Sequence, residues 1–253
     1  MSNLTKPIYN KLLRINSADR SNDSASTTDF TVDYPNVQVL AKIVSVVVKH
    51  VSFPNVFYNI TSNNNVLKHE GLAGVVITTV VPVGSYTLSS LTAFLATELI
   101  TIVQDPLTFL LTFTASVGFP LRIYGPEDGS TLAPYLGIPA TTPLNTSDFT
   151  APNAPKLQGV QHVHIASKFL SKGNNMIDAN TSQEIPVVAI IPCDVPVGSI
   201  KHYETFHEML DVINYESEQT LQTIDIKLYD DERNLLDLLG QDISIVLKIY
   251  YRV

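Results

Sequence analysis

The chain has 253 residues, one cysteine and a formal net charge of −8, and charged residues make up 16% of it, against about 25% in a typical soluble domain. One cysteine excludes an intrachain disulfide and a cysteine-rich metal site, and the acidic balance argues against a basic face that neutralises nucleic-acid phosphates. A surface short of charge is typical of large protein interfaces, so the composition favours a component of an assembly.

The first 28 residues predict a polar N-terminal arm that is flexible or becomes ordered on assembly. Its segment 21–28 (SNDSASTT) offers almost no apolar side chain for burial. The arm also lacks the basic-then-apolar pattern of a secretory signal, so we expect intracellular synthesis.

Short segments of alternating apolar residues follow the arm and predict half-buried strands. The alternation is strictest at 107–113, 224–228 and 243–249. The expected strands, in chain order, are 29–34, 40–53, 74–81, 107–115, 121–124, 160–169, 185–191, 221–229 and 242–252. Strands in this number, with helices only in the connections, favour a jelly roll or a related sandwich.

Two helices are expected between these strands. The first is amphipathic, because five apolar residues fall at near-helical spacing: Leu88, Leu91, Leu95, Leu99 and Ile102. The second is short, spans 132–136 and ends at Gly137. The segment 139–155 is rich in Thr, Pro, Ala and Asn and predicts a loop excursion. The sequence therefore predicts an all-β protein, a single jelly-roll β-sandwich over 29–253 with one or two short connecting helices.

Histidines are the first place to look for a metal site. His162 and His164 lie two apart on an expected strand, so both side chains point to one face and could supply two zinc ligands. Their other interpretation is that they are outward polar positions, because no neighbouring motif completes a tetrahedral site. A second group combines histidines and carboxylates at a spacing that suits neither a helix face nor a strand face: His202, Glu204, His207 and Glu208.

Motifs for nucleophilic catalysis and phosphate binding are missing from the sequence. Cys193 ends an expected strand, where a lone cysteine is usually a small packed residue. The acidic run 230–232 is typical of a solvated turn. We therefore expect a protein that is not an enzyme and has no catalytic residue, no cofactor and no bound metal.

Segments spread along most of the chain carry a family resemblance in their order and spacing. They are 13–20 (LRINSADR), 29–32 (DFTV), 51–60 (VSFPNVFYNI), 84–88 (GSYTL), 136–138 (LGI), 187–199 and the closing strand after Gly240. Taken together they resemble the vertex (penton) minor capsid proteins of the virophage, polinton-like virus and giant-virus lineage of double-stranded DNA viruses.

The resemblance implies a single jelly roll that forms a homopentamer at the vertices of an icosahedral capsid. It implies contacts with a surrounding double-jelly-roll major capsid protein and with other minor capsid proteins. It places the protein in the virion, after synthesis in the host cytoplasm or a viral factory. Direct nucleic-acid binding and a membrane span are not expected.

Four residues of the arm are the expected assembly contacts: Ile15, Asn16, Asp19 and Arg20. A guanidinium forms directed, bidentate contacts, although Asp19 and Arg20 could equally cap the first strand. Other interpretations stay open. They are another small jelly-roll minor or cement capsid protein, a carbohydrate- or receptor-binding sandwich that uses Tyr58, Asn59 and 63–65, and a cupin-like enzyme built on His162 and His164.

Overall fold

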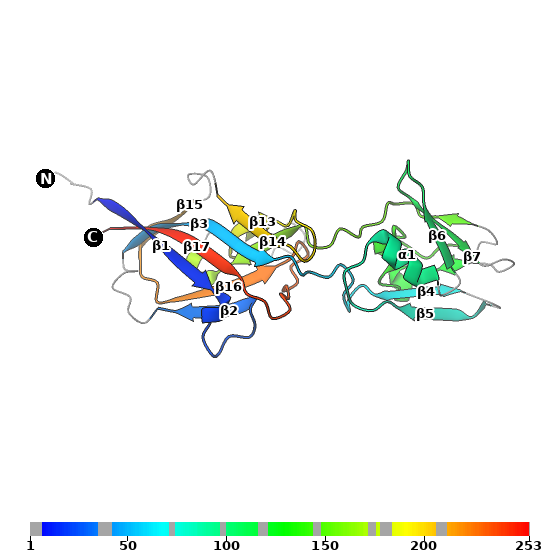
Figure 1. The fold of residues 1–253 in the computed structure, drawn as a ribbon, viewed down its shortest axis with the longest axis horizontal. Coiled ribbons are helices and arrows are strands. Elements are labelled where there is room, and N and C mark those ends of the chain that lie inside the picture. Colours follow the sequence, from blue (N-terminus) through cyan, green and yellow to red (C-terminus); the bar gives the residue numbers. More distant parts are fainter. Residues whose placement is uncertain are drawn as a thin grey trace. The chain divides into compact units, whose positions relative to one another are not determined.

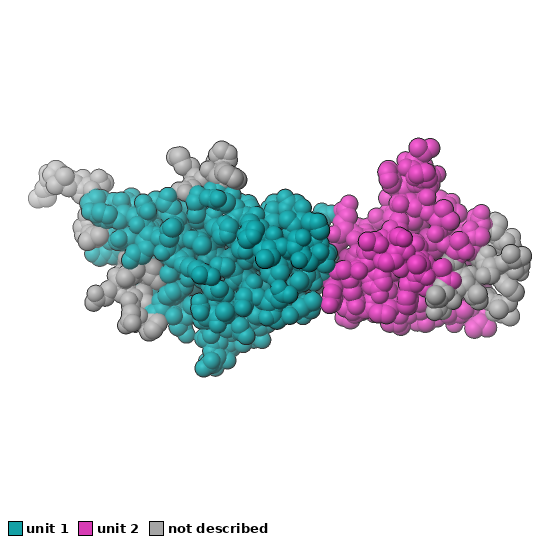
Figure 2. All heavy atoms as spheres, viewed as in Figure 1, with its two compact units in different colours: residues 1–57, 160–253 teal, residues 58–159 magenta. Residues whose placement is uncertain are grey.

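The computed structural model describes residues 7–34, 42–70, 74–96, 100–115, 121–143, 148–171, 176–177, 184–205 and 212–252. The chain divides into two compact units: unit 1 comprises 1–57 and 160–253, and unit 2 comprises 58–159 (Figures 1 and 2). This differs from the expected single domain over 29–253. The physical reason is that the apolar side chains form two separate clusters, one in each unit, and each cluster closes on itself.

Unit 1 contains two antiparallel sheets that face each other across its core. The first sheet comprises β1 (Ile8–Asn16), β17 (Ser244–Arg252), β3 (Ile43–Pro54), β14 (Ile200–Glu204) and β15 (Val212–Gln219). Its order is β1-β17-β3, after which β14 and β15 pair with successive parts of the same edge of β3. The second sheet comprises β13 (Val187–Pro192), β10 (His162–Ala166), β16 (Thr223–Tyr229) and β2 (Asp29–Asp33), in that order.

The order in which the chain visits these sheets is that of a jelly roll. It passes from β1 to β2 to β3 by changing sheet each time, then runs β10 and β13 in the second sheet, and finally alternates β14/β15, β16 and β17. The result is two Greek keys folded into a double-layered sandwich. The prediction of an all-β, jelly-roll sandwich is confirmed.

Period-2 alternation aims one set of side chains from each strand into this core. β16 and β17 alternate buried and half-buried positions along most of their lengths. β3, which has strands on both sides within the first sheet, is continuously buried over 45–48 and alternates buried and half-buried positions over 51–54. Phe30, Phe53 and Leu247 are among the fully buried side chains between the layers. Burial of each large apolar side chain contributes about 1.5–3 kcal/mol.

The expected N-terminal arm is largely part of unit 1. β1 pairs with β17 over nine residues, from Ile8 opposite Arg252 to Asn16 opposite Ser244. The polar segment after it is held by hydrogen bonds rather than by apolar burial, as where Ser21 N–H donates to the Thr31 carbonyl at 2.8 Å and Thr28 Oγ1 donates to the Leu236 carbonyl at 2.6 Å. Low hydrophobicity predicted a flexible arm, but pairing with β17 and hydrogen bonds hold these residues in unit 1. Residues 1–6 lie outside the described residues.

Unit 2 is inserted in the connection between β3 and β10. Its strands are β5 (Val76–Val80), β4 (Val66–Glu70) and β8 (Arg122–Ile123) in one sheet, and β6 (Ile100–Gln104), β7 (Leu111–Ala115) and β9 (Phe149–Thr150) in another. Helix α1 (Leu88–Ala96) buries Leu91 and Leu95 against the core of this unit. The expected excursion 139–155 belongs to unit 2 and includes β9.

Several smaller elements complete the description. Among the described residues they are α2 (Lys168–Ser171), the two-stranded sheet of β11 (Met176–Ile177) and β12 (Glu184–Ile185), and 3-10 turns at Ser17–Asp19, Pro126–Asp128 and Ala133–Leu136. The expected helical stripe is shorter than predicted, because Ile102 belongs to β6; Leu99 lies outside the described residues. Gly137 ends the third turn in the left-handed conformation, as predicted. None of the described helices is long and apolar enough to cross a membrane.

Candidate assembly surfaces

The four expected assembly residues surround the end of β1 but do not form one surface. Ile15 is fully buried in the sandwich core, so its side chain is unavailable to a neighbouring molecule and the expectation is corrected for this residue. Asn16 caps the following turn, where its Oδ1 accepts a hydrogen bond from Ala18 N–H at 2.9 Å. Asp19 and Arg20 are exposed, and Arg20 Nη1 donates to the Ser17 carbonyl at 2.8 Å. Asp19 and Arg20 are therefore accessible to another molecule, and their role as assembly contacts stays a prediction.

The two histidines of β10 share one carboxylate partner. His162 Nδ1 lies 2.8 Å and His164 Nε2 lies 3.6 Å from Oδ1 of Asp231, on the loop after β16. The other Asp231 oxygen accepts backbone N–H groups of Gln161 and His162 at 3.1 and 3.0 Å. Burial opposes ionisation of Asp231, but these hydrogen bonds outweigh it and lower its pKa. The arrangement ties the start of β10 to the β16–β17 loop.

A second pair of histidines lies on the first sheet. The rings of His50 on β3 and His202 on β14 stack with their centroids 6.0 Å apart. Glu204 Oε1 lies 3.4 Å from Lys49 Nζ rather than joining a histidine site. His207 and Glu208 lie outside the described residues. Among the described residues, no group of three or more His, Cys, Asp or Glu side chains is arranged to hold a metal ion.

Cys193 and three asparagines of the carbohydrate-binding interpretation (Asn59, Asn64 and Asn65) take part in contacts within the chain. Cys193 is half-buried, and burial raises the pKa of its thiol to about 11, against the opposing effect of Lys201. Asn59 Nδ2 donates to the carbonyls of Tyr86 and Leu157 at 2.7 and 2.8 Å. Asn64 and Asn65 are buried and donate to backbone carbonyls as well. The amide groups of Asn59, Asn64 and Asn65 are therefore engaged inside unit 2, whereas Asn63 and Tyr58 are exposed.

One lateral edge of the jelly roll presents β1. Within the described part of the chain, β1 pairs on one side with β17 and has no strand on its other side. Ile8, Tyr9 and Leu12 are exposed along it, and Leu12 has the largest exposed fraction of the three, 63%. The strand carries two basic residues, Lys11 and Arg14, and no carboxylate. This face is called the β1 edge, comprising residues 8–14.

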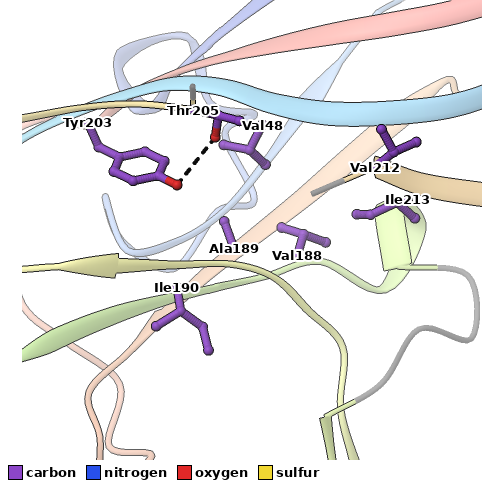
Figure 3. Close-up of a pocket in the computed structure, with 8 residues that line it drawn as sticks. All are labelled: Val48, Val188, Ala189, Ile190, Tyr203, Thr205, Val212 and Ile213. Carbon is purple, nitrogen blue, oxygen red and sulfur yellow. Dashed lines mark hydrogen bonds between the residues drawn. The ribbon is translucent and has the colours of Figure 1, made fainter. Parts of the chain in front are cut away.

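The opposite lateral edge presents β13 from the second sheet and β14 and β15 from the first. A pocket of about 360 Å³ opens between the two sheets there; six of its eight lining residues are aliphatic, and Tyr203, Thr205 and backbone atoms add polar surface to its wall. Figure 3 draws the eight lining residues: Val188 and Ala189 face Val48, Tyr203 and Thr205 across the gap, Val212 and Ile213 lie at one end, and Ile190 points away from the gap. Thr205 Oγ1 donates to Tyr203 Oη at 3.3 Å at one end. We call this lining the edge pocket.

Acidic residues accompany the edge pocket. β15 carries Glu216 and Glu218, both exposed, and no basic residue. Glu218 Oε1 lies 3.8 Å from Arg252 Nη1 of the same chain, and both side chains are 40% exposed. Among the edge strands of the first sheet, β1 is therefore basic and β15 is acidic, while β14 carries one charge of each sign, Lys201 and Glu204.

Neither β1 nor β15 is predicted from the sequence, whereas β13 falls within the expected strand 185–191 apart from its last residue. β1 was hidden because, of its nine residues, only Ile15 is fully buried and Leu13 partly packs on the core, so no continuous alternation is visible. β15 was hidden because its outer half, ending Glu216-Ser217-Glu218-Gln219, reads as a polar loop. A usable signal was present in both: each strand combines a few apolar residues with charge of one sign.

Comparisons with known proteins add one structural likeness. No family model matches the sequence, and no curated protein matches it. Among solved structures, the crystal structure of the mavirus penton protein matches with a TM-score of 0.49 and 8% identity, over 97% of this chain and 100% of that one. A likeness of this size does not establish a function, and the jelly-roll assignment depends on the strand order of unit 1. The chain is thus similar, at this level, to a protein named as the mavirus penton protein.

Proposed function

We propose that this chain is a structural capsid protein that forms the pentameric vertex of an icosahedral double-stranded DNA virus. The observation that carries the proposal is the jelly roll of unit 1 with apolar residues exposed on both of its lateral edges. An exposed edge strand with apolar side chains is an aggregation hazard unless another chain covers it. Lateral packing around a closed ring covers every such edge without open-ended growth.

Two described groups that could carry chemistry, the Asp231 carboxylate and the Cys193 thiol, lie in surroundings that support a structural role. Asp231 is hydrogen-bonded by His162 and by the backbone, and the Cys193 thiol has a raised pKa that keeps it protonated near neutral pH. In this proposal the protein is not an enzyme. Its partners are further copies of itself, the surrounding double-jelly-roll major capsid protein and other minor capsid proteins. It resides in the virion, after synthesis in the host cytoplasm or a viral factory.

Native mass spectrometry of the purified chain, at several concentrations and in moderate salt, tests this proposal. A discrete five-subunit species that grows with concentration is expected. If the chain is monomeric, the measurement is repeated with the major capsid protein present. A chain that stays monomeric and does not bind the major capsid protein contradicts the vertex role. A chain that binds it without forming a pentamer would instead be a minor or cement capsid protein.

A further inference from the structure

The geometry points to a head-to-tail contact between copies of this chain, in which the β1 edge of one copy packs against the edge pocket and β15 of the next. The two surfaces lie at opposite ends of the same sheet order, β1-β17-β3-β15, so one molecule cannot bring them together itself. This inference deepens the proposed function, because it names the surfaces through which the ring would close.

Charge complementarity identifies the occupant of each edge. The β1 edge has Lys11 and Arg14 without a carboxylate, and β15 has Glu216 and Glu218 without a basic residue. Two β1 edges placed together would bring like charges into contact, and so would two β15 strands. Like charges across an interface are unfavourable, whereas opposite charges steer the two surfaces together and fix their register. The pattern therefore favours a second copy in a head-to-tail orientation over a two-fold symmetric contact.

Apolar complementarity points the same way. The β1 edge projects exposed aliphatic and aromatic side chains, with Ile8 at 55% and Tyr9 at 47% exposure. The ring of Tyr9 packs against the ring of Tyr251, and the two ring centroids lie 6.1 Å apart. The edge pocket offers a recess, with six aliphatic residues among its eight lining residues, to receive such side chains, and Ile190 at its rim points outward and is 45% exposed. Side chains seated in a desolvated pocket carry most of the free energy of a protein interface.

Symmetry turns this contact into a ring. A head-to-tail contact leaves one β1 edge and one edge pocket unused at the ends of any open chain of subunits. If each contact adds the same rotation between neighbouring subunits, the chain of subunits closes into a ring in which every β1 edge and every edge pocket is covered. The contact is the same whatever the number of subunits, so the identity of the two surfaces is tested separately from the number five.

Charge reversal on each edge, alone and together, tests the inference. The variants are Lys11→Glu/Arg14→Glu, Glu216→Lys/Glu218→Lys, and the chain that carries all four changes. Native mass spectrometry and sedimentation measure the concentration at which half of each protein is oligomeric. Each edge variant should raise that concentration by about tenfold or more, and the combined variant should recover most of the loss. A two-fold contact between β1 edges would instead leave the Glu216→Lys/Glu218→Lys variant unaffected.

An uncharged position supplies a second test. Leu12→Asp places a carboxylate on the exposed β1 edge and should weaken oligomerisation without lowering the melting temperature of the monomer. Leu107→Asp, at an 88% exposed position of unit 2, is the matched control and should leave oligomerisation unchanged. Carbodiimide cross-linking of the wild-type protein, with mass spectrometry of the linked peptides, should join Lys11 of one copy to Glu216 or Glu218 of another.

The outcomes separate the two proposals. Pentamers that withstand both edge variants, with no cross-link between β1 and β15, overturn the inference and leave the vertex role intact. Oligomers of another size that the edge variants dissolve support the inference and contradict the pentamer. A wild-type chain that stays monomeric and yields no cross-link at high concentration overturns the inference, and binding to the major capsid protein then decides the vertex role.

Discussion

Ser17 fastens the end of the first strand to the beginning of the last. Its Oγ donates to Asp242 Oδ1 at 2.7 Å and accepts from Ile243 N–H at 3.0 Å, while its own N–H donates to the Ile243 carbonyl at 3.0 Å. Ser17 is fully buried. Residues 226 positions apart in the sequence thereby anchor β1 to the jelly roll, and the exposed β1 edge depends on that anchor.

Replacement of Ser17 by Ala removes the hydroxyl from this buried site. The Ile243 N–H then lacks its side-chain acceptor, and we expect Ser17→Ala to lower the free energy of unfolding by about 1–3 kcal/mol. Urea unfolding followed by circular dichroism measures the change. Ser217→Ala, at an exposed position of β15, is the control and should change stability by less than about 0.5 kcal/mol. Equal effects of the two substitutions would show that the anchor is unimportant.

Two glycines of unit 2 have almost the same backbone conformation but different surroundings. Gly129 and Gly137 have φ of +83° and +84°. A Cβ at Gly129 meets the end of the Lys68 side chain, which can move, whereas a Cβ at Gly137 overlaps the Asn153 carbonyl of the backbone. We expect Gly129→Ala to cost about 1 kcal/mol from backbone strain, and Gly137→Ala roughly 1–3 kcal/mol more. Thermal unfolding of both variants checks this order, and a reversal would contradict the packing described for 137.

The stability conferred by Asp231 should depend on pH. Burial raises its pKa, but the hydrogen bonds from His162 and Gln161 prevail, so the folded value lies below the usual 3.8. A group with a lowered folded pKa stabilises the protein fully above its unfolded value and loses that contribution as the pH falls through the folded value. We expect the stability difference between wild type and Asp231→Ala to be largest above pH 5 and to shrink below about pH 3.8.

Urea unfolding at a series of pH values measures this difference. Asp23→Ala, which removes an exposed carboxylate, is the control and should show no comparable dependence on pH. A stability difference for Asp231→Ala that stays constant down to pH 2 would mean that the hydrogen bonds to Asp231 do not favour its ionised form.

Cys193 should react slowly with alkylating reagents in the folded protein. Its thiol pKa rises from 9.0 to about 11 because of burial, so the reactive thiolate at pH 8 falls by about 100-fold relative to the unfolded chain. Iodoacetamide labelling followed by mass spectrometry, in buffer and in urea, compares the two rates. Similar rates in the two solutions would show that the thiol is open to solvent.

The sequence by itself determined the all-β class, most strands of the core and the turn at Gly137. These follow from local rules: alternation places every second side chain on one face, and a left-handed position favours glycine. The strands β2, β3, β10, β13, β16 and β17 all lie within or close to the predicted ranges. Each carries enough apolar residues at period two for the pattern to stand out from its surroundings.

Only the tertiary structure decided the division into units, the fate of the arm and the location of the edges. Whether apolar residues of 60–151 join the sandwich core or form their own depends on which side chains meet in space. β1 is a strand because β17 offers it a nine-residue partner, and an edge strand needs few buried residues of its own. The basic strand β1 and the acidic strand β15 lie at opposite edges of the first sheet because β17 and β3 pair between them. The pairing order of distant segments does not follow from any local sequence pattern.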